Sequence, residues 1–151
     1  MKTNLLTLFA ILALGLTHSF GHGDVEIGPN GGRILEFSKD ETMHGEVTLK
    51  GDKFHIALLD KNMKPVALAE QTLTATSGDR DKPEKLAVEK SGDHFVVPML
   101  KGEDFWIVFQ FKLTPAAKPI TARLHYEAKL CPTCKKGEWL CDCEKKEAKK
   151  K

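Results

Sequence analysis

The chain has 151 residues, a formal net charge of only +2 and four cysteines. This length suits one globular domain of about 100–150 residues that can bury its own core. So weak a net charge gives no general basic field, and we expect no nucleic-acid partner. The charge is uneven: residues 22–129 carry 15 basic and 17 acidic residues, whereas residues 130–151 carry 7 and 4. We therefore expect a boundary near residue 129.

Residues 1–21 have the pattern of a signal peptide that is cleaved on export. Lys2 gives a positive start, and a mostly apolar run follows over residues 5–16. Ser19 and Gly21 place small residues at the −3 and −1 positions of a cleavage site. The run is shorter than the ~20 residues of a membrane-spanning helix, so a retained anchor is the less favoured alternative. We expect a protein of the periplasm or the extracellular space, with no transmembrane segment after cleavage.

Residues 28–32 read Gly-Pro-Asn-Gly-Gly, a dense cluster of turn-forming residues. Glycine supplies positive φ and proline a preset φ, so the cluster predicts a tight turn that leads into the first strand. A phosphate-binding loop is disfavoured, because no lysine-serine pair follows and the next segment has strand character.

From residue 33 onward, apolar and polar residues alternate with a period of two, which is typical of half-buried strands. Turn signals recur every 8–12 residues, and no stretch outside the signal peptide has a clear helical stripe. This pattern predicts an all-β fold, an immunoglobulin-like antiparallel β-sandwich over residues 22–129. The clearest strand segments are 43–50, 53–59, 72–76, 105–113 and 121–127. The side chains expected to point into one core are Phe54, Ile56, Phe105, Ile107, Phe109, Leu124 and Tyr126.

The strand histidines are candidate metal ligands, and the turn at Gly51-Asp52 predicts how they are placed. A two-residue hairpin loop there sets His55 opposite Thr48 and leaves His44 four residues away on the same face. That separation is about 13 Å at strand rise, so the two imidazoles cannot share one ion. We expect both at half-exposed surface positions, with Glu46 beside His55 in the same surface arrangement.

The four cysteines Cys131, Cys134, Cys141 and Cys143 fall within thirteen residues in the pattern C-x2-C-x6-C-x-C. Two kinds of site fit cysteines that are spaced this closely. One is a four-thiolate metal site for zinc, and the other is a pair of disulfides formed in an oxidising compartment. Zinc is slightly favoured, because C-x-C is a poor geometry for an adjacent disulfide. A redox pair at the first two cysteines has little support, because no βαβ context surrounds it.

These cysteines define a predicted knuckle over residues 130–143, with Trp139 between the two pairs as a cap or as an anchor on the sandwich. The lysine-rich residues 144–151 are expected to form a disordered, solvated end. At the other terminus, cleavage after Gly21 would leave His22 with an amine and an imidazole, a combination that can chelate copper; an unbound terminus is the ordinary alternative. Serines lie in turn-like settings and paired carboxylates in loops, so we expect no catalytic site.

Three stretches together resemble a known group of proteins: residues 22–37 with their Gly-Pro-Asn-Gly-Gly segment, residues 58–66, and the closing cysteine pattern. The chain resembles small exported bacterial proteins of unassigned function, and also the extra domain at the head of some heavy-metal efflux adaptor proteins. The resemblance implies a β-sandwich in the cell envelope that works close to the transport of metal ions. The function we expect is non-catalytic binding of a transition metal or of an envelope protein partner. The alternatives are a structural, partner-binding sandwich closed by disulfides and, with less support, a thiol oxidoreductase.

Overall fold

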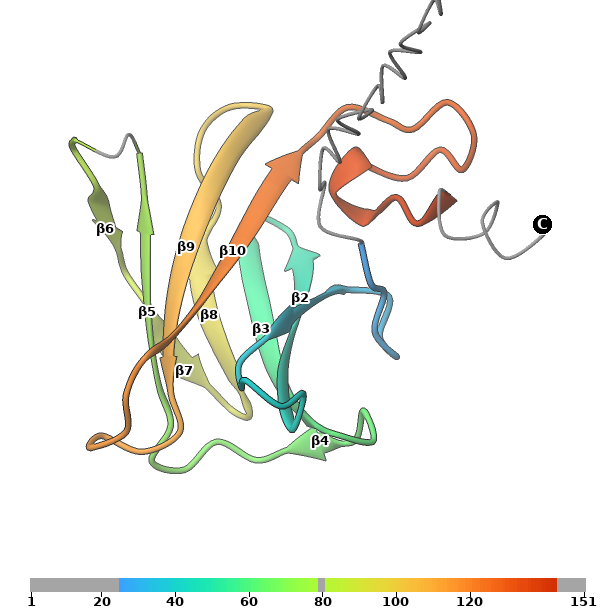
Figure 1. The fold of residues 1–151 in the computed structure, drawn as a ribbon. Coiled ribbons are helices and arrows are strands. Elements are labelled where there is room, and N and C mark those ends of the chain that lie inside the picture. Colours follow the sequence, from blue (N-terminus) through green and yellow to red (C-terminus); the bar gives the residue numbers. More distant parts are fainter. Residues whose placement is uncertain (1–24, 79–80, 144–151) are drawn as a thin grey trace, which may run out of the picture.

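The computed structural model of the protein describes residues 25–78 and 81–143 (Figure 1). The predicted signal peptide, His22 and the lysine-rich end lie outside these residues. Within them, no helix is long and apolar enough to cross a membrane. The elements are β1 (Arg33–Glu36), β2 (Met43–Lys50), β3 (Lys53–Asp60), β4 (Pro65–Val66), β5 (Thr72–Ser77), β6 (Glu84–Leu86), β7 (Glu89–Ser91), β8 (His94–Pro98), β9 (Asp104–Lys112), β10 (Ile120–Glu127) and the 3-10 turn η1 (Glu138–Leu140).

The strands form two antiparallel sheets that pack face to face (Figure 1). A six-stranded sheet has the order β1-β2-β3-β8-β7, with β4 paired to the end of β3. A four-stranded sheet has the order β10-β9-β5-β6. The predicted all-β antiparallel sandwich is therefore confirmed, with the cysteines at its C-terminal end.

The β2–β3 hairpin has the register that the Gly51-Asp52 turn predicts. Lys50 pairs with Lys53, and His55 lies opposite Thr48. Gly51 has a φ of 63°, a conformation that favours glycine in a primed two-residue turn. Because side chains alternate along a strand, this register sends Phe54, Ile56 and Leu58 of β3 into the core.

One apolar core fills the space between the sheets. Phe37 and Phe111 stack there with ring centroids 4.7 Å apart. Phe105 is only half-buried and packs against the rim of this core. The prediction is wrong at residue 113: β9 ends at Lys112, and Leu113 is 52% exposed in the turn that follows. Six of the seven predicted core residues are buried, namely Phe54, Ile56, Ile107, Phe109, Leu124 and Tyr126.

The alternation of apolar and polar residues did not predict strand β8, for a physical reason. Phe95, Val96 and Val97 are all buried, so the strand has no polar alternation to reveal it. It pairs with β3 and places Val96 opposite His55 and His94 opposite Ala57. Two histidines that are far apart in the sequence thereby become neighbours.

The surface positions predicted for His44 and Glu46 are wrong: strand β1 lies beside His44, and the chain before β1 covers Glu46. His44 is 4% exposed and its Nδ1 lies 2.9 Å from Oε1 of Glu36. Glu46 has no exposed surface, and its carboxylate accepts hydrogen bonds from Asn30 and from the backbone N–H of Gly32. The turn at residues 28–32 is thus confirmed as a tight turn, and it folds over a buried carboxylate.

Candidate metal centre

The first cysteine pair lies in a tight loop that follows β10. The backbone N–H of Lys135 donates to the carbonyl of Cys131 over 2.9 Å, and the N–H of Cys131 donates to the carbonyl of Lys136 over 2.8 Å. Lys135 closes the loop with a φ of 61°. These constraints bend residues 131–136 back on themselves, so that Cys134 returns to the side of Cys131.

The turn η1 brings the second pair back towards the first. The N–H of Leu140 donates to the carbonyl of Gly137 over 2.9 Å, and the N–H of Cys141 donates to that of Glu138 over 3.0 Å. The chain then runs extended through Cys141, with φ −82° and ψ 117°. This reversal lets a spacer of only six residues close a four-cysteine cluster.

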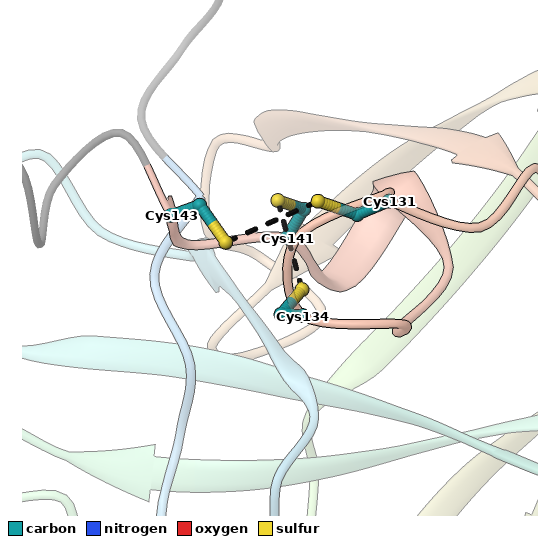
Figure 2. A group of neighbouring side chains, drawn as sticks. All are labelled: Cys131, Cys134, Cys141 and Cys143. Atoms are coloured by element: carbon teal, nitrogen blue, oxygen red, sulfur yellow. Dashed lines mark hydrogen bonds between the residues drawn. The ribbon is translucent and has the colours of Figure 1, made fainter.

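The four sulfur atoms point towards one common centre (Figure 2). All four Sγ atoms of Cys131, Cys134, Cys141 and Cys143 lie within 4.8 Å of one another. Two sulfur pairs, 131–143 and 134–141, are each separated by 3.9 Å. A zinc ion with Zn–S bonds of ~2.3 Å needs tetrahedron edges of about 3.8 Å. All four cysteines are free, and both of these distances far exceed the ~2.05 Å of a disulfide bond.

Hydrogen bonds make the four thiols unequal in acidity. The backbone N–H of Cys134 lowers the pKa of Cys131 to about 6, with further contributions from the Cys141 thiol and the N–H of Thr133. The pKa of Cys143 rises instead to about 12, chiefly because of its hydrogen bonds with the thiols of Cys134 and Cys141. The first thiolate therefore forms at Cys131, and each further thiolate meets the charge of those already present. A divalent cation at the centre removes this repulsion, since it binds the deprotonated form of every ligand.

Trp139 anchors the knuckle on the sandwich, which decides between the two roles predicted for it. Its side chain is buried, and its ring meets Phe54 edge-on with centroids 6.1 Å apart. The ring of Tyr126 lies closer still, with centroids 5.5 Å apart. Gly137 is required beside this ring, because a Cβ there would lie 2.8 Å from Cδ1 of Trp139.

Arg33 ties the knuckle to the first strand, a role that the sequence analysis missed. Its Nη1 donates to the carbonyl oxygen of Trp139 over 3.3 Å. Partial burial lowers the pKa of Arg33, and the carbonyl offers the half-buried guanidinium a polar partner. Because Arg33 directly follows the turn at residues 28–32, one short segment both covers Glu46 and holds the knuckle. The N-terminal motif and the cysteine pattern are therefore parts of one structural unit.

The four described histidines do not join the cysteines. His125 contacts Oδ1 of Asp104 through Nε2 over 2.7 Å and stacks on Trp106. His44 and His55 lie apart, as predicted, whereas His55 and His94 have ring centroids 6.0 Å apart. Over residues 25–78 and 81–143, the four cysteines form the only group of three or more histidine, cysteine, aspartate or glutamate residues placed to hold an ion together.

Comparison of the chain with models of protein families, with curated proteins and with solved structures finds no match. The chemistry of the four sulfur atoms is therefore the main guide to function. Four protein thiolates complete a tetrahedron around one ion, which is the arrangement of structural zinc sites. Catalytic zinc sites keep one position for water or substrate.

Proposed function

We propose that this protein is an exported, non-catalytic binding module whose C-terminal knuckle holds one zinc ion through Cys131, Cys134, Cys141 and Cys143. The observation that carries the proposal is the convergence of all four Sγ atoms to within 4.8 Å of one another. Zinc is the ion of choice, because it accepts four thiolates in a tetrahedron and has no redox chemistry of its own. Copper(I) also prefers sulfur and is the competing ion.

The role of the ion is to order the knuckle. Of residues 130–143, only Cys131 and Trp139 are buried, so this segment has almost no core of its own. Segments of this kind need a cross-link or a metal to hold one conformation. With the ion bound, the knuckle packs Trp139 against the core beside Phe54 and Tyr126.

Export is the second part of the proposal, and it depends on the sequence of residues 1–21. A metal-bound set of thiolates is compatible with an oxidising compartment, because coordination occupies the sulfur atoms that would otherwise be oxidised. The sandwich would then serve as a platform for an envelope protein partner. The competing function, thiol oxidation at Cys131, is disfavoured because this residue is 5% exposed, whereas reactive cysteines are partly accessible.

Protein purified from the periplasm under mild conditions tests both parts. We expect one zinc per chain, and a mass that places the N-terminus at or within two residues of His22. Cys134→Ser should lose the zinc, and Thr133→Ala, an exposed neighbour, is the matched control that should retain it. Two disulfides would appear instead as a loss of about 4 Da with no metal, since one hydrogen leaves each sulfur. That result, or four freely alkylated thiols without metal, would refute the zinc site; a full-length chain recovered from the cytoplasm would refute export.

A further inference from the structure

His55 and His94 lie side by side on the outer face of the six-stranded sheet. Strands β3 and β8 are antiparallel, and the register puts His55 opposite Val96 and His94 opposite Ala57. The two histidines are therefore diagonal neighbours on one face, a spacing within reach of long side chains. That face is directed away from the core, because Phe54 and Ile56, which flank His55 in β3, are fully buried on the other side.

The two imidazoles differ from the other described strand histidines in having no polar partner. His44 is held by Glu36 and His125 by Asp104. Within the described part of the chain, neither the imidazole of His55 nor that of His94 makes a hydrogen bond or an ion pair; the hydrogen bond from Thr48 goes to the backbone carbonyl of His55. Both side chains are half-buried, so they are accessible to solvent and also restrained by their neighbours. Their nitrogen atoms are therefore available to a ligand.

The ring separation lies within the range that two imidazoles on one ion allow. With metal–nitrogen bonds of ~2.0–2.1 Å, ring centroids lie at most about 6.4 Å apart, and about 5.2 Å apart at a tetrahedral angle. The observed separation is 6.0 Å, with the ring planes at 72°. The tetrahedral separation is only about 0.8 Å shorter than the observed one. We infer that His55 and His94 form a second metal site, for a divalent transition-metal ion that prefers nitrogen ligands.

The electrostatic surroundings select the class of ion. Partial burial lowers the pKa of His55, and the charges of Lys50, His94 and Lys53 lower it further. The lowered pKa favours the neutral imidazole of His55, which is the form that coordinates a metal. The positive charges of Lys50 and Lys53 oppose the binding of ions that are held mainly by electrostatic attraction. This disfavours calcium and magnesium, which need carboxylate oxygens, and favours nickel, copper or zinc, which bind imidazole.

The site is open, in contrast to the four cysteines. A surface hollow of about 800 Å³ adjoins His94 and is also lined by Thr48, Ala57 and Asp93. Water or a small oxygen ligand can occupy this space and complete the coordination of an ion held by two nitrogens. The chain would then carry one closed site, in which the ion is structural, and one open site, in which it exchanges with solvent.

Calorimetric titration with Ni²⁺ tests this inference on the zinc-loaded mature protein. Nickel binds imidazole well and is not reduced by thiols, and a His22→Ala background removes chelation at the N-terminus. We expect one nickel per chain. His55→Ala and His94→Ala should each weaken binding by at least about tenfold, because a single remaining imidazole loses the advantage of two linked ligands. His125→Ala, which removes a histidine from the other sheet, should leave the affinity unchanged.

Two further readouts show whether a loss of nickel binding comes from misfolding or from the cysteine site. Circular dichroism should be the same for all three histidine variants, and substoichiometric Ni²⁺ should broaden the imidazole proton signals of His55 and His94 before that of His44. Equal nickel affinity in the wild type and in both variants would overturn the inference. So would nickel binding that disappears in Cys134→Ser and persists in the histidine variants. The zinc content, measured in the same samples, reports separately on the cysteines.

Discussion

Asn30 donates two hydrogen bonds to the carboxylate of Glu46: its backbone N–H reaches one oxygen and its side-chain amide the other, each over 2.7 Å. Gly28 and Gly32 allow this approach, because a Cβ on Gly28 would lie 2.6 Å from Cδ of Glu46 and one on Gly32 2.9 Å from its Cγ. The Gly-Pro-Asn-Gly-Gly sequence therefore has a defined structural role in this chain. It encloses a buried carboxylate that anchors the entry to β1 (Arg33–Glu36).

We expect Glu46→Ala to lower the free energy of unfolding by about 3 kcal/mol, because it leaves the buried N–H of Gly32 and the part-buried N–H donors of Asn30 without an acceptor. Asn30→Ala should cost about 1 kcal/mol, since it removes one donor and keeps the backbone bonds. Urea denaturation measures both changes. Glu89→Ala, at an exposed position of β7, is the control and should stay within about 0.5 kcal/mol of the wild type. A cost for Glu46→Ala no greater than that of the control would contradict the anchoring role.

The anchoring of the knuckle can be tested at its tryptophan. Trp139→Ala should destabilise the protein by about 3–5 kcal/mol, because it empties a buried site beside Phe54 and Tyr126. Trp106 offers a matched comparison, since it is 52% exposed on the outer face of the four-stranded sheet. Trp106→Ala should cost about 1 kcal/mol or less. Similar melting temperatures for the two variants would show that the knuckle does not belong to the core.

The long strand β9 provides a test of the core itself. Phe109 is fully buried between the sheets, so Phe109→Ala should cost about 3–5 kcal/mol. Leu113 was predicted on the same face but lies exposed beyond the end of the strand. Leu113→Ala should therefore change stability by less than about 0.5 kcal/mol. Chemical denaturation distinguishes this outcome from the predicted strand, in which both substitutions would be costly.

Asp60 makes stability depend on pH in a defined direction. Its Oδ1 accepts hydrogen bonds from the backbone N–H groups of Lys64 and Asn62, and these bonds lower its pKa in the folded state. A lowered carboxyl pKa stabilises the fold above the pKa of the unfolded chain, about 3.9, and the benefit is lost as the pH falls through the folded value. Asp60→Ala should thus melt below the wild type at pH 7, and the difference should shrink towards pH 2. Asp52→Ala, at another exposed aspartate, is the control; a gap that widens on acidification would contradict this account.

Local patterns were enough to predict several elements of this protein. The Gly51-Asp52 turn fixed the register of β2 and β3, because a two-residue loop leaves one pairing only. The four cysteines were predicted as one unit from their spacing, and their sulfur atoms do converge. Both inferences use residues that are close in the sequence, where chain geometry limits the alternatives.

The remaining features depend on long-range pairing that no local pattern reports. Glu46 looked like a surface residue because it alternates with apolar neighbours, yet residues 28–32 cover it. His94 was not linked to His55, because β8 is apolar on both faces and its pairing with β3 spans about forty residues of chain. Arg33 gave no sign that its partner is Trp139, 106 residues further along the chain. In each case the decisive contact is made by tertiary packing.

The central claim, that four thiolates surround one zinc ion, is tested most directly by X-ray absorption at the zinc edge of the purified protein. We expect one zinc per chain with four sulfur neighbours at ~2.3 Å and no nitrogen or oxygen ligand in the first shell. Cys134→Ser should replace one sulfur by a lighter neighbour or lose the ion altogether. A first shell of nitrogen and oxygen atoms at ~2.0–2.1 Å in the wild type, or the absence of zinc from the intact protein, would contradict the claim.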